Sequence, residues 1–335
     1  MSHKGSAALA ENFTLTHWIF FNLILAALLV LDLKVLTRNS REVSMKQAAW
    51  LTAFWWGVAT ICGIWIFTTG STDQGLNYTT AFVVEKALSV DNLFVFLVIF
   101  TYFGLPKGAR LRALFYGIIG ALIARAIFIA IGLSIISAFS WVLFLLGAFL
   151  VYTGYKIAFL GDSEVDPGQN PVVRAFRKFM PVTDQYHGHN FFTRLPNGAK
   201  AATPFLLVII ALGTTDIIFA IDSIPTVFGI TKDPFIVWSS NAMAVLGLRP
   251  LFFLLSGLVQ IFRFLQYGLA LVLVLIGIKM VLEEAAHTFE FHLPTLMESP
   301  FLSLAVISTI FALAIVLSKV IPASPENHLK SEAAE

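Results

Sequence analysis

Long apolar stretches recur along the chain, separated by short polar connections. A stretch of about 20 apolar residues has the length of an α-helix that crosses the hydrocarbon core of a bilayer. The pattern therefore predicts an all-α polytopic membrane protein with about nine transmembrane helices. The predicted helices cover residues 17–36, 45–68, 78–104, 110–136, 139–160, 203–229, 236–260, 265–284 and 300–321.

One connection is much longer than the others. Residues 161–200 are polar and rich in proline and glycine, and we interpret them as a cytosolic loop that divides the chain into halves. The predicted organisation is an extracytoplasmic tail (1–16), two N-terminal helices (17–68), a three-helix unit (78–160), the loop, a second three-helix unit (201–284), a last helix (300–321) and a cytosolic tail (322–335).

Basic residues set the predicted orientation. They gather in the connections that follow the first, third, fifth and seventh predicted helices, whereas the opposite side carries mainly acidic residues. Because cytoplasmic loops carry an excess of Lys and Arg, the N-terminus is predicted outside and the C-terminus in the cytosol, in the inner (cytoplasmic) membrane. The basic residues that decide this are Lys34, Arg38, Arg41, Lys46, Lys107, Arg110, Arg112, Arg174, Arg177, Lys178, Arg194, Lys200 and Arg263.

Composition excludes a soluble domain, since 58% of the 335 residues are hydrophobic and 13% are charged. The sequence holds a single cysteine, Cys62, so neither an internal disulfide nor a thiolate metal cluster can form within one chain. It also contains no nucleotide-binding loop, which argues against ATP as a driving force. We expect the lipid bilayer as a partner, no nucleic acid, no enzymatic activity and no tightly bound cofactor.

Two similar motifs place pairs of carboxylates inside apolar segments. The first runs from Glu85 to Asn92 (EKALSVDN) and the second from Asp216 to Ser223 (DIIFAIDS), and in each the two acids are six residues apart. A charged side chain at the bilayer centre costs at least about 2.5 kcal/mol, so these acids need partners, water or a bound cation.

Further matches indicate an internal repeat. The two motifs are followed by equivalent arginines and equivalent Gly-x-Lys triplets, at spacings of 131, 131, 124 and 123 residues. Two successive three-helix units of this kind have opposite orientations in the membrane, as in transporters whose site lies where inverted repeats meet. The alternative is a chance alignment on an apolar background. The matched positions are Glu85 and Asp216, Asp91 and Asp222, Arg125 and Arg249, and Gly154–Lys156 and Gly277–Lys279.

Helix geometry decides how the motifs could bind an ion. Residues six apart on one helix point about 120° apart, so we expect the two motif helices to face each other. Their carboxylate, amide and hydroxyl oxygens are hard ligands, which suit Mg²⁺, Ca²⁺ or Mn²⁺. Four acids against Arg125 and Arg249 leave two negative charges for a divalent ion, or one if Lys86 also faces the site. The alternative is a set of structural salt bridges. The expected metal ligands are Glu85, Asp91, Asn92, Asp216, Asp222 and Ser223.

Prolines suggest irregular helices in the second half. Pro225 and Pro250 lack the backbone N–H that would bond the carbonyls of Ile221 and Leu246, which predicts either helix breaks or ordinary kinks. Asp222 also lies deeper in its predicted helix than Asp91 does, so that helix should begin later than residue 203 or be broken. Asp32 lies near the cytosolic end of the first predicted helix and is either a gate residue or an interfacial acid.

At these motifs the sequence resembles the TerC family of integral membrane proteins, above all its longer, Alx-like members. The resemblance extends over residues 17–321 and includes Ser240-Asn241 and Leu246-Gly-Leu-Arg249. It implies a nine-helix fold and export of Mn²⁺, with the six ligands above handling the ion and Arg125, Asn241, Arg249 and Asp32 supporting them. Family members usually carry a Glu at the position of Gly213, so one potential ligand is missing here.

Together these observations predict a secondary transporter that exports Mn²⁺ from the cytosol by alternating access, with Ca²⁺ or Mg²⁺ competing and the proton as coupling ion. In this mechanism the ion replaces Arg125 and Arg249 as the partner of the carboxylates. Two other functions remain open. One is a membrane-assembly factor that contacts the translocon through the 161–200 loop, and the other is a cation channel.

Overall fold

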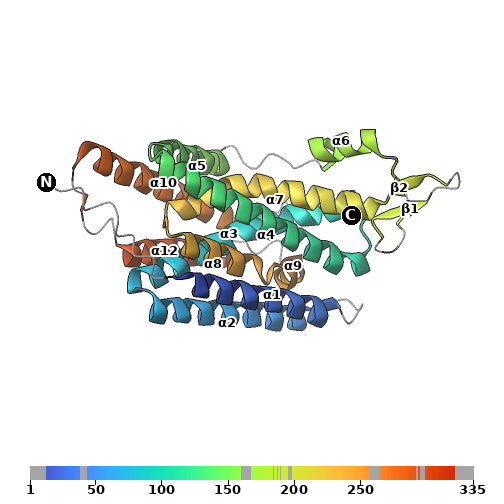
Figure 1. Ribbon diagram of the computed structural model, residues 1–335, viewed down its shortest axis with the longest axis horizontal. Coiled ribbons are helices and arrows are strands. Elements are labelled where there is room, and N and C mark those ends of the chain that lie inside the picture. The colour runs from blue at the N-terminus through green and yellow to red at the C-terminus, as the bar shows by residue number, and fades with distance from the viewer. Residues whose placement is uncertain are drawn as a thin grey trace.

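The structure is a computed structural model that describes residues 13–37, 44–159, 167–183, 185–186, 188, 190–194, 198–256, 264–291, 293–294 and 299–320. Of residues 35–37, 91, 169 and 222 it describes the backbone alone. Long helices run side by side along the long axis of the molecule (Figure 1). The helices of the bundle, including the short α8 and α9, are α1 (Leu15–Thr37), α2 (Met45–Thr69), α3 (Thr72–Tyr102), α4 (Lys107–Ala138), α5 (Val142–Phe159), α7 (Pro204–Phe228), α8 (Pro234–Val245), α9 (Leu248–Ser256), α10 (Leu265–Phe289) and α12 (Pro300–Val320).

Within the described ranges, seven helices are long and apolar enough to cross a membrane, and the bent pair α8–α9 would make an eighth. The central helix α3 has 31 residues, but Glu85, Lys86 and Asp91 interrupt its apolar sequence. The predicted class, an all-α membrane protein with many transmembrane helices, is confirmed.

The predicted cytosolic loop carries small elements of its own at one end of the bundle (Figure 1). They are the helix α6 (Pro171–Phe179) and an antiparallel hairpin of β1 (Phe192–Arg194) and β2 (Lys200–Ala202). Tyr186 ties this region to the bundle, because its hydroxyl donates to the carbonyl oxygen of Phe103 at 2.7 Å. Burial raises the pKa of Tyr186 to about 12, since the phenolate would be poorly solvated there.

The start of α3 differs from the prediction by six residues. The helix begins at Thr72, where Ser71 and Gln74 form a capping box, and the Gln74 amide also donates to Asp233 Oδ2 at 2.7 Å. Asp91 therefore lies 19 residues after the first residue of α3, and Asp222 lies 18 after the first residue of α7. The two motifs sit at matching depth, and the expectation of a later start or a break in α7 was wrong.

The two prolines have different effects. The helix α7 continues through Pro225, which lies in its last turn, and Gly229 N–H bonds the Pro225 carbonyl oxygen at 3.0 Å. The predicted helix 236–260, in contrast, is divided into α8 and α9, which are bent by 45°. Gly247 makes this break with a φ of +79°, and a Cβ there would lie 2.6 Å from the Cβ of Trp55. Only glycine reaches this conformation without strain.

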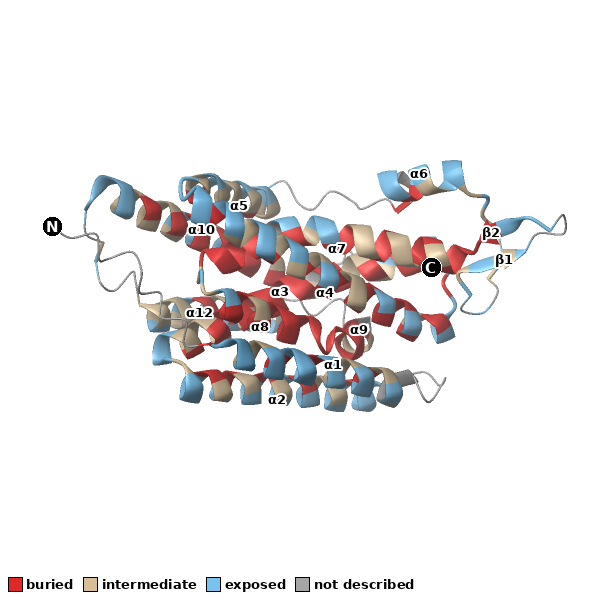
Figure 2. Ribbon diagram, viewed as in Figure 1, coloured by how far each residue is buried: buried red, intermediate tan, exposed pale blue. Residues whose placement is uncertain are grey.

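Helices α3 and α8 form the centre of the bundle. Helix α3 packs against α8, α7, α2 and α12, while α4 packs against α7 and α8. Ten of the 12 residues of α8 are buried, and they include the polar residues Ser239, Ser240 and Asn241. Figure 2 shows buried residues concentrated on these inner helices and exposed residues on the outer faces of α1 and α2. Large exposed apolar side chains on α2, such as Trp50 and Ile61, form a surface suited to lipid.

Helices α5 and α10 are in backbone contact. A Cβ at Gly154 would lie 2.6 Å from the carbonyl oxygen of Ala270, and one at Gly277 would lie 2.6 Å from that of Gly147. Small residues at such positions allow close packing of membrane helices. As residue numbers rise along α5 they fall along α10, so the two helices run antiparallel.

Candidate functional site

A buried ion-pair cluster lies where α3, α4, α7 and α8 meet. The guanidinium of Arg125 on α4 donates through Nη1 to the carboxylate of Glu85 on α3 and to Asn241 Oδ1 on α8, the latter at 2.8 Å. Its Nε lies 3.8 Å from Asp216 Oδ2 on α7. Arg125, Glu85 and Asp216 are all buried, with side-chain exposures of 1%, 0% and 3%.

The cluster brings together residues that the sequence places far apart. Arg125 connects one acid from each motif, as expected if the motif helices approach each other. Helices α3 and α7 are indeed in contact. Asn241, assigned a supporting role through the family resemblance, is held by a second hydrogen bond from its amide to the Val237 carbonyl oxygen at 3.0 Å.

Several buried oxygens on the two motif helices accept no hydrogen bond from any described group. They are Glu85 Oε2, Asp216 Oδ2 and the hydroxyl oxygen of Ser223. A buried polar atom without a partner is uncommon and is usually satisfied by water or an ion. Carboxylate and hydroxyl oxygens are suitable ligands for a hard divalent cation.

The predicted ligand set is only partly visible. The side chains of Asp91 and Asp222 lie outside what the structure describes, although their backbones belong to α3 and α7. Asn92 and Ser223 are buried on these two helices. Among the described residues, no group of three His, Cys, Asp or Glu side chains has an arrangement that could hold a metal ion.

Arg249 forms a separate ion pair. Its Nη1 donates to Asp32 Oδ2 at 2.6 Å and to the Asp32 carbonyl oxygen at 3.2 Å, and its guanidinium carbon lies 5.4 Å from the ring centroid of Phe115. Asp32 is 4% exposed, so it lies inside the bundle and its role as a gate residue or an interfacial acid stays a prediction. Removing one partner of a pair buried in this way strongly destabilises the folded protein, because the other charge is left buried without compensation.

Lys86 is a buried cation whose partners were not predicted. Its ammonium donates to the carbonyl oxygens of Ala244 at 2.7 Å and Leu246 at 3.0 Å, both at the break between α8 and α9. The Leu246 carbonyl is the one that Pro250 leaves without its helical partner. The sequence features that could have predicted this contact were Pro250 and the presence of a lysine inside an apolar segment.

Gly213 lies on α7, one turn before Asp216, and faces open space. A Cβ built there would meet no atom within 4 Å. The Cβ of the Glu that TerC members usually carry at this position would therefore fit without a clash, and its side chain would lie on the same face of the helix as Asp216.

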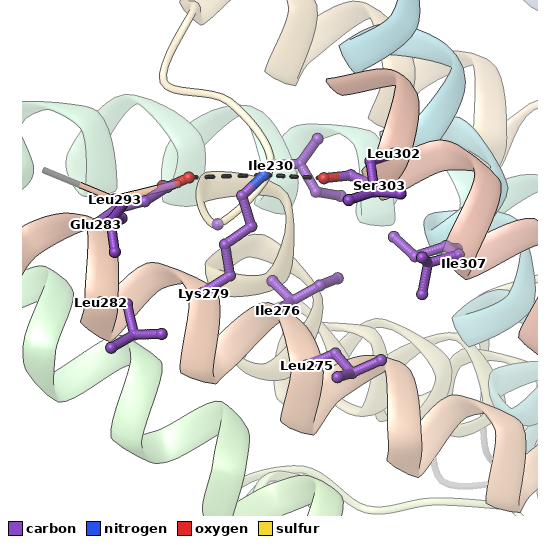
Figure 3. Close-up of a pocket in the computed structure, with 12 residues that line it drawn as sticks. Ile230, Leu275, Ile276, Lys279, Leu282, Glu283, Leu293, Leu302, Ser303 and Ile307 are labelled. Carbon is purple, nitrogen blue, oxygen red and sulfur yellow. Dashed lines mark hydrogen bonds and ion pairs between the residues drawn. The ribbon is translucent and has the colours of Figure 1, made fainter. Parts of the chain in front are cut away.

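A cavity of about 270 Å³ lies away from these residues, between α10, α12 and the turn after α7 (Figure 3). Its lining is mostly apolar. Figure 3 shows the Lys279 ammonium extended between Ser303 and Glu283, at 2.9 Å from the Ser303 hydroxyl and 3.6 Å from the Glu283 carboxylate. None of the motif acids lines this cavity.

The fold and its interior define a multi-pass membrane protein with a buried polar centre. Comparison with known proteins then identifies its family. Residues 70–326 match the integral membrane protein TerC family, and the chain belongs to this family.

Its relatives are bacterial membrane proteins. The chain is 42% identical over 283 residues to the Alx protein of Salmonella typhi, which carries the provisional name of membrane-bound redox modulator, with 81% of this chain and 86% of that protein covered. It is 41% identical over 283 residues to Alx of Escherichia coli K12 (81% and 87% covered). It is also 41% identical over 265 residues to an uncharacterized membrane protein of Myxococcus xanthus (79% and 83% covered). No solved structure matched the chain.

Proposed function

We propose that this protein is a secondary transporter that exports Mn²⁺ from the cytosol by alternating access. The observation that supports this most directly is the position of Arg125. Its guanidinium lies between carboxylates of the two motifs, and a cation from solution could bind the same oxygens. An ionisable cluster inside a membrane bundle is typical of an ion pathway.

The charges of the core favour a divalent ion. Arg249 is balanced by Asp32, which leaves Arg125 and the ammonium of Lys86 as the cations to set against the four motif acids. The remaining charge is two negatives if all four acids are ionised. Transport of Mn²⁺ would neutralise it, and the oxygen ligands suit Mn²⁺, Mg²⁺ or Ca²⁺ rather than a thiophilic metal.

The contacts between α5 and α10 support an inverted repeat. A shift of 123 residues pairs Gly154 with Gly277, and it also pairs their neighbours across the interface. A Cβ at Gly154 would contact Val274 Cγ2 at 2.7 Å, and one at Gly277 would contact Val151 Cγ2 at 2.9 Å. Contacts that are exchanged in this way are expected across a two-fold axis. Because the two helices are antiparallel, such an axis inverts one unit relative to the other.

Packing of the other helices has the same symmetry. Helix α3 packs against α8, and its counterpart α7 packs against α4, the counterpart of α8. We infer two inverted three-helix units, α3–α5 and α7–α10, that meet at the Arg125 cluster. Counting α3 as a span and α8–α9 as one broken span gives nine, with the N-terminus outside and the C-terminus in the cytosol of a bacterial inner membrane.

In the proposed cycle, Mn²⁺ reaches the carboxylates from the cytosol and displaces Arg125. The bundle then opens outward, and the ion leaves as the guanidinium or protons return to the acids. Glu85, Asp91, Asn92, Asp216, Asp222 and Ser223 are the proposed ligands, while Asn241 positions Arg125 and the Asp32–Arg249 pair holds α1 against the core. No enzymatic step or tightly bound cofactor is needed.

A second candidate function is that of an assembly factor that docks through the loop. It is favoured by Phe179 at the end of α6, which is 89% exposed and follows Arg177 and Lys178. Replacing residues 161–200 with a flexible linker would abolish this role and leave metal transport largely intact.

Proteoliposomes loaded with a metal-sensitive dye test the proposal. Wild-type protein is expected to carry Mn²⁺ in preference to Zn²⁺, with Ca²⁺ and Mg²⁺ as competitors, at rates far below those of a channel. Glu85→Gln and Asp216→Asn should lower the rate by about tenfold or more, a loss of about 1.4 kcal/mol of transition-state stabilisation per factor of ten. Glu283→Gln, which lies in the separate cavity, is the matched control and should transport normally.

A cellular assay extends the test to the two acids whose side chains the structure does not describe. Cells that express Asp91→Ala or Asp222→Ala should be sensitive to high Mn²⁺ and accumulate it. Survival and internal manganese equal to those of wild type would contradict the proposal.

A further inference from the structure

The break between α8 and α9 creates acceptors that the helices cannot satisfy. Helix α8 ends at Val245, and its last carbonyls have no intrahelical donors. Pro250 lacks the N–H that would otherwise serve the Leu246 carbonyl. Inside a membrane bundle, such carbonyls require another donor or a cation.

Electrostatics favours a cation at this position. The C-terminal end of a helix carries a partial negative charge, and unwound carbonyls at half-helix ends coordinate cations in other membrane proteins. The carbonyl oxygens of Ala244 and Leu246 both lie within 3.0 Å of one point, the nitrogen of Lys86. That nitrogen also lies 5.9 Å from the ring centroid of Phe82, a distance at which an aromatic ring attracts a cation.

Lys86 reaches this point from α3 and is 5% exposed. Its neighbour Glu85 points in a different direction, because consecutive residues on a helix are about 100° apart. Glu85 bonds Arg125, whereas Lys86 bonds the break. Two adjacent charged residues of the first motif thus serve two different sites.

We propose that the carbonyl oxygens at the α8–α9 break form a monovalent-cation site of ammonium size, and that Lys86 fills it with its own side chain. The lysine is a tethered cation. Removing its side chain opens the site to ammonium, methylammonium or K⁺ from solution. In the wild-type protein the site is already occupied, so neither stability nor transport should depend on these ions.

The test is thermal unfolding of full-length Lys86→Ala in detergent, without Mn²⁺ and at constant ionic strength. In N-methyl-D-glucamine chloride the Tm of the variant should be lower than that of wild type. Ammonium or methylammonium chloride should raise it saturably, by about 3 °C or more, because a ligand that binds only the folded state stabilises it. Wild-type protein should not respond.

Lys279→Ala is the matched control, since Lys279 bonds a hydroxyl and a carboxylate instead of free carbonyls. An absent response in Lys86→Ala, or an equal response in the control, overturns the proposal. This measurement does not depend on transport. A negative result here therefore does not contradict the proposed export function, and absence of Mn²⁺ transport in proteoliposomes does not contradict the cation site.

A second variant keeps the inference testable if Lys86→Ala fails to fold. Lys86→Met fills the space of the lysine side chain without a charge, and it should unfold at a lower Tm than wild type with no response to ammonium. If Lys86→Met unfolds at the wild-type Tm, or if ammonium raises its Tm, the position needs no tethered cation and the proposal is wrong.

Discussion

Gly277 and Gly147 bring the backbones of α10 and α5 into direct contact. A Cβ at Gly277 would lie 2.6 Å from the Gly147 carbonyl oxygen, closer than two such atoms can approach. The obstacle is backbone, so a larger residue can be accommodated only if the two helices separate. In the proposed inverted repeat, this interface lies between the two three-helix units.

Gly277→Ala is therefore expected to destabilise the protein by about 1–3 kcal/mol, the usual effect of overpacking. Gly154→Ala, its counterpart on α5, should have a similar effect because it meets equivalent atoms. Gly57→Ala is the control, since a Cβ there meets nothing within 4 Å and alanine favours the helix. Thermal unfolding in detergent provides the measurement. Wild-type stability of Gly277→Ala would show that α5 and α10 are not in backbone contact.

Arg125→Gln should convert the buried cluster into a tighter divalent-ion site. In the proposed mechanism Mn²⁺ displaces the guanidinium of Arg125 from Glu85 and Asp216, and in the variant the carboxylates have lost this competitor. Without metal the variant should be less stable by about 3–5 kcal/mol, because a buried ion pair has lost one member. Mn²⁺ should restore much of this stability.

The measurement is the Tm as a function of Mn²⁺ concentration, compared with Arg110→Gln on the same helix. A Tm for Arg125→Gln that Mn²⁺ leaves unchanged would mean that the two acids do not bind the ion and serve only to hold Arg125.

The sequence predicted the helices well because their signal is local. Apolar segments of membrane length are visible without any knowledge of packing. The early start of α3 was missed because residues 72–77 are largely polar, although Ser71 and Gln74 carry a capping-box signature. Pro250 left a break and an ordinary kink equally open, and the break lies at Gly247; Pro225 interrupts little because it lies in the last turn of α7.

The site was harder to predict because the partners are set by packing. The predicted repeat pairs Arg125 with Arg249, yet Arg125 bonds the motif acids and Arg249 bonds Asp32, 217 residues away. Lys86 posed the same difficulty. Helix α3 is surrounded by other helices, so no amphipathic face indicates which way each charged residue points.

Gly213→Glu tests whether the missing family acid limits the site. The position has open space, and the new carboxylate would share a helix face with Asp216. We expect the apparent affinity for Mn²⁺ in proteoliposomes to rise by about tenfold, which is 1.4 kcal/mol. Gly213→Gln has the same shape without the charge and should resemble the wild type. Equal effects of Glu and Gln would assign the change to packing instead of ion binding.

A double-mutant cycle on Asp32 and Arg249 separates structural from transport roles. Asp32→Asn leaves the guanidinium of Arg249 buried without its carboxylate, and Arg249→Met leaves the acid alone, so each should lower the stability by about 3–5 kcal/mol. The double variant leaves neither charge of this pair unbalanced and should recover part of the loss, with a coupling energy of about 1 kcal/mol or more by thermal unfolding. Simple additivity would mean that the 2.6 Å pair contributes no interaction energy.

Transport then provides the second readout. If the pair only holds α1 against the core, the double variant should export Mn²⁺ at the wild-type rate, whereas a variant that is stable but inactive would place Arg249 in the ion-exchange step beside Arg125.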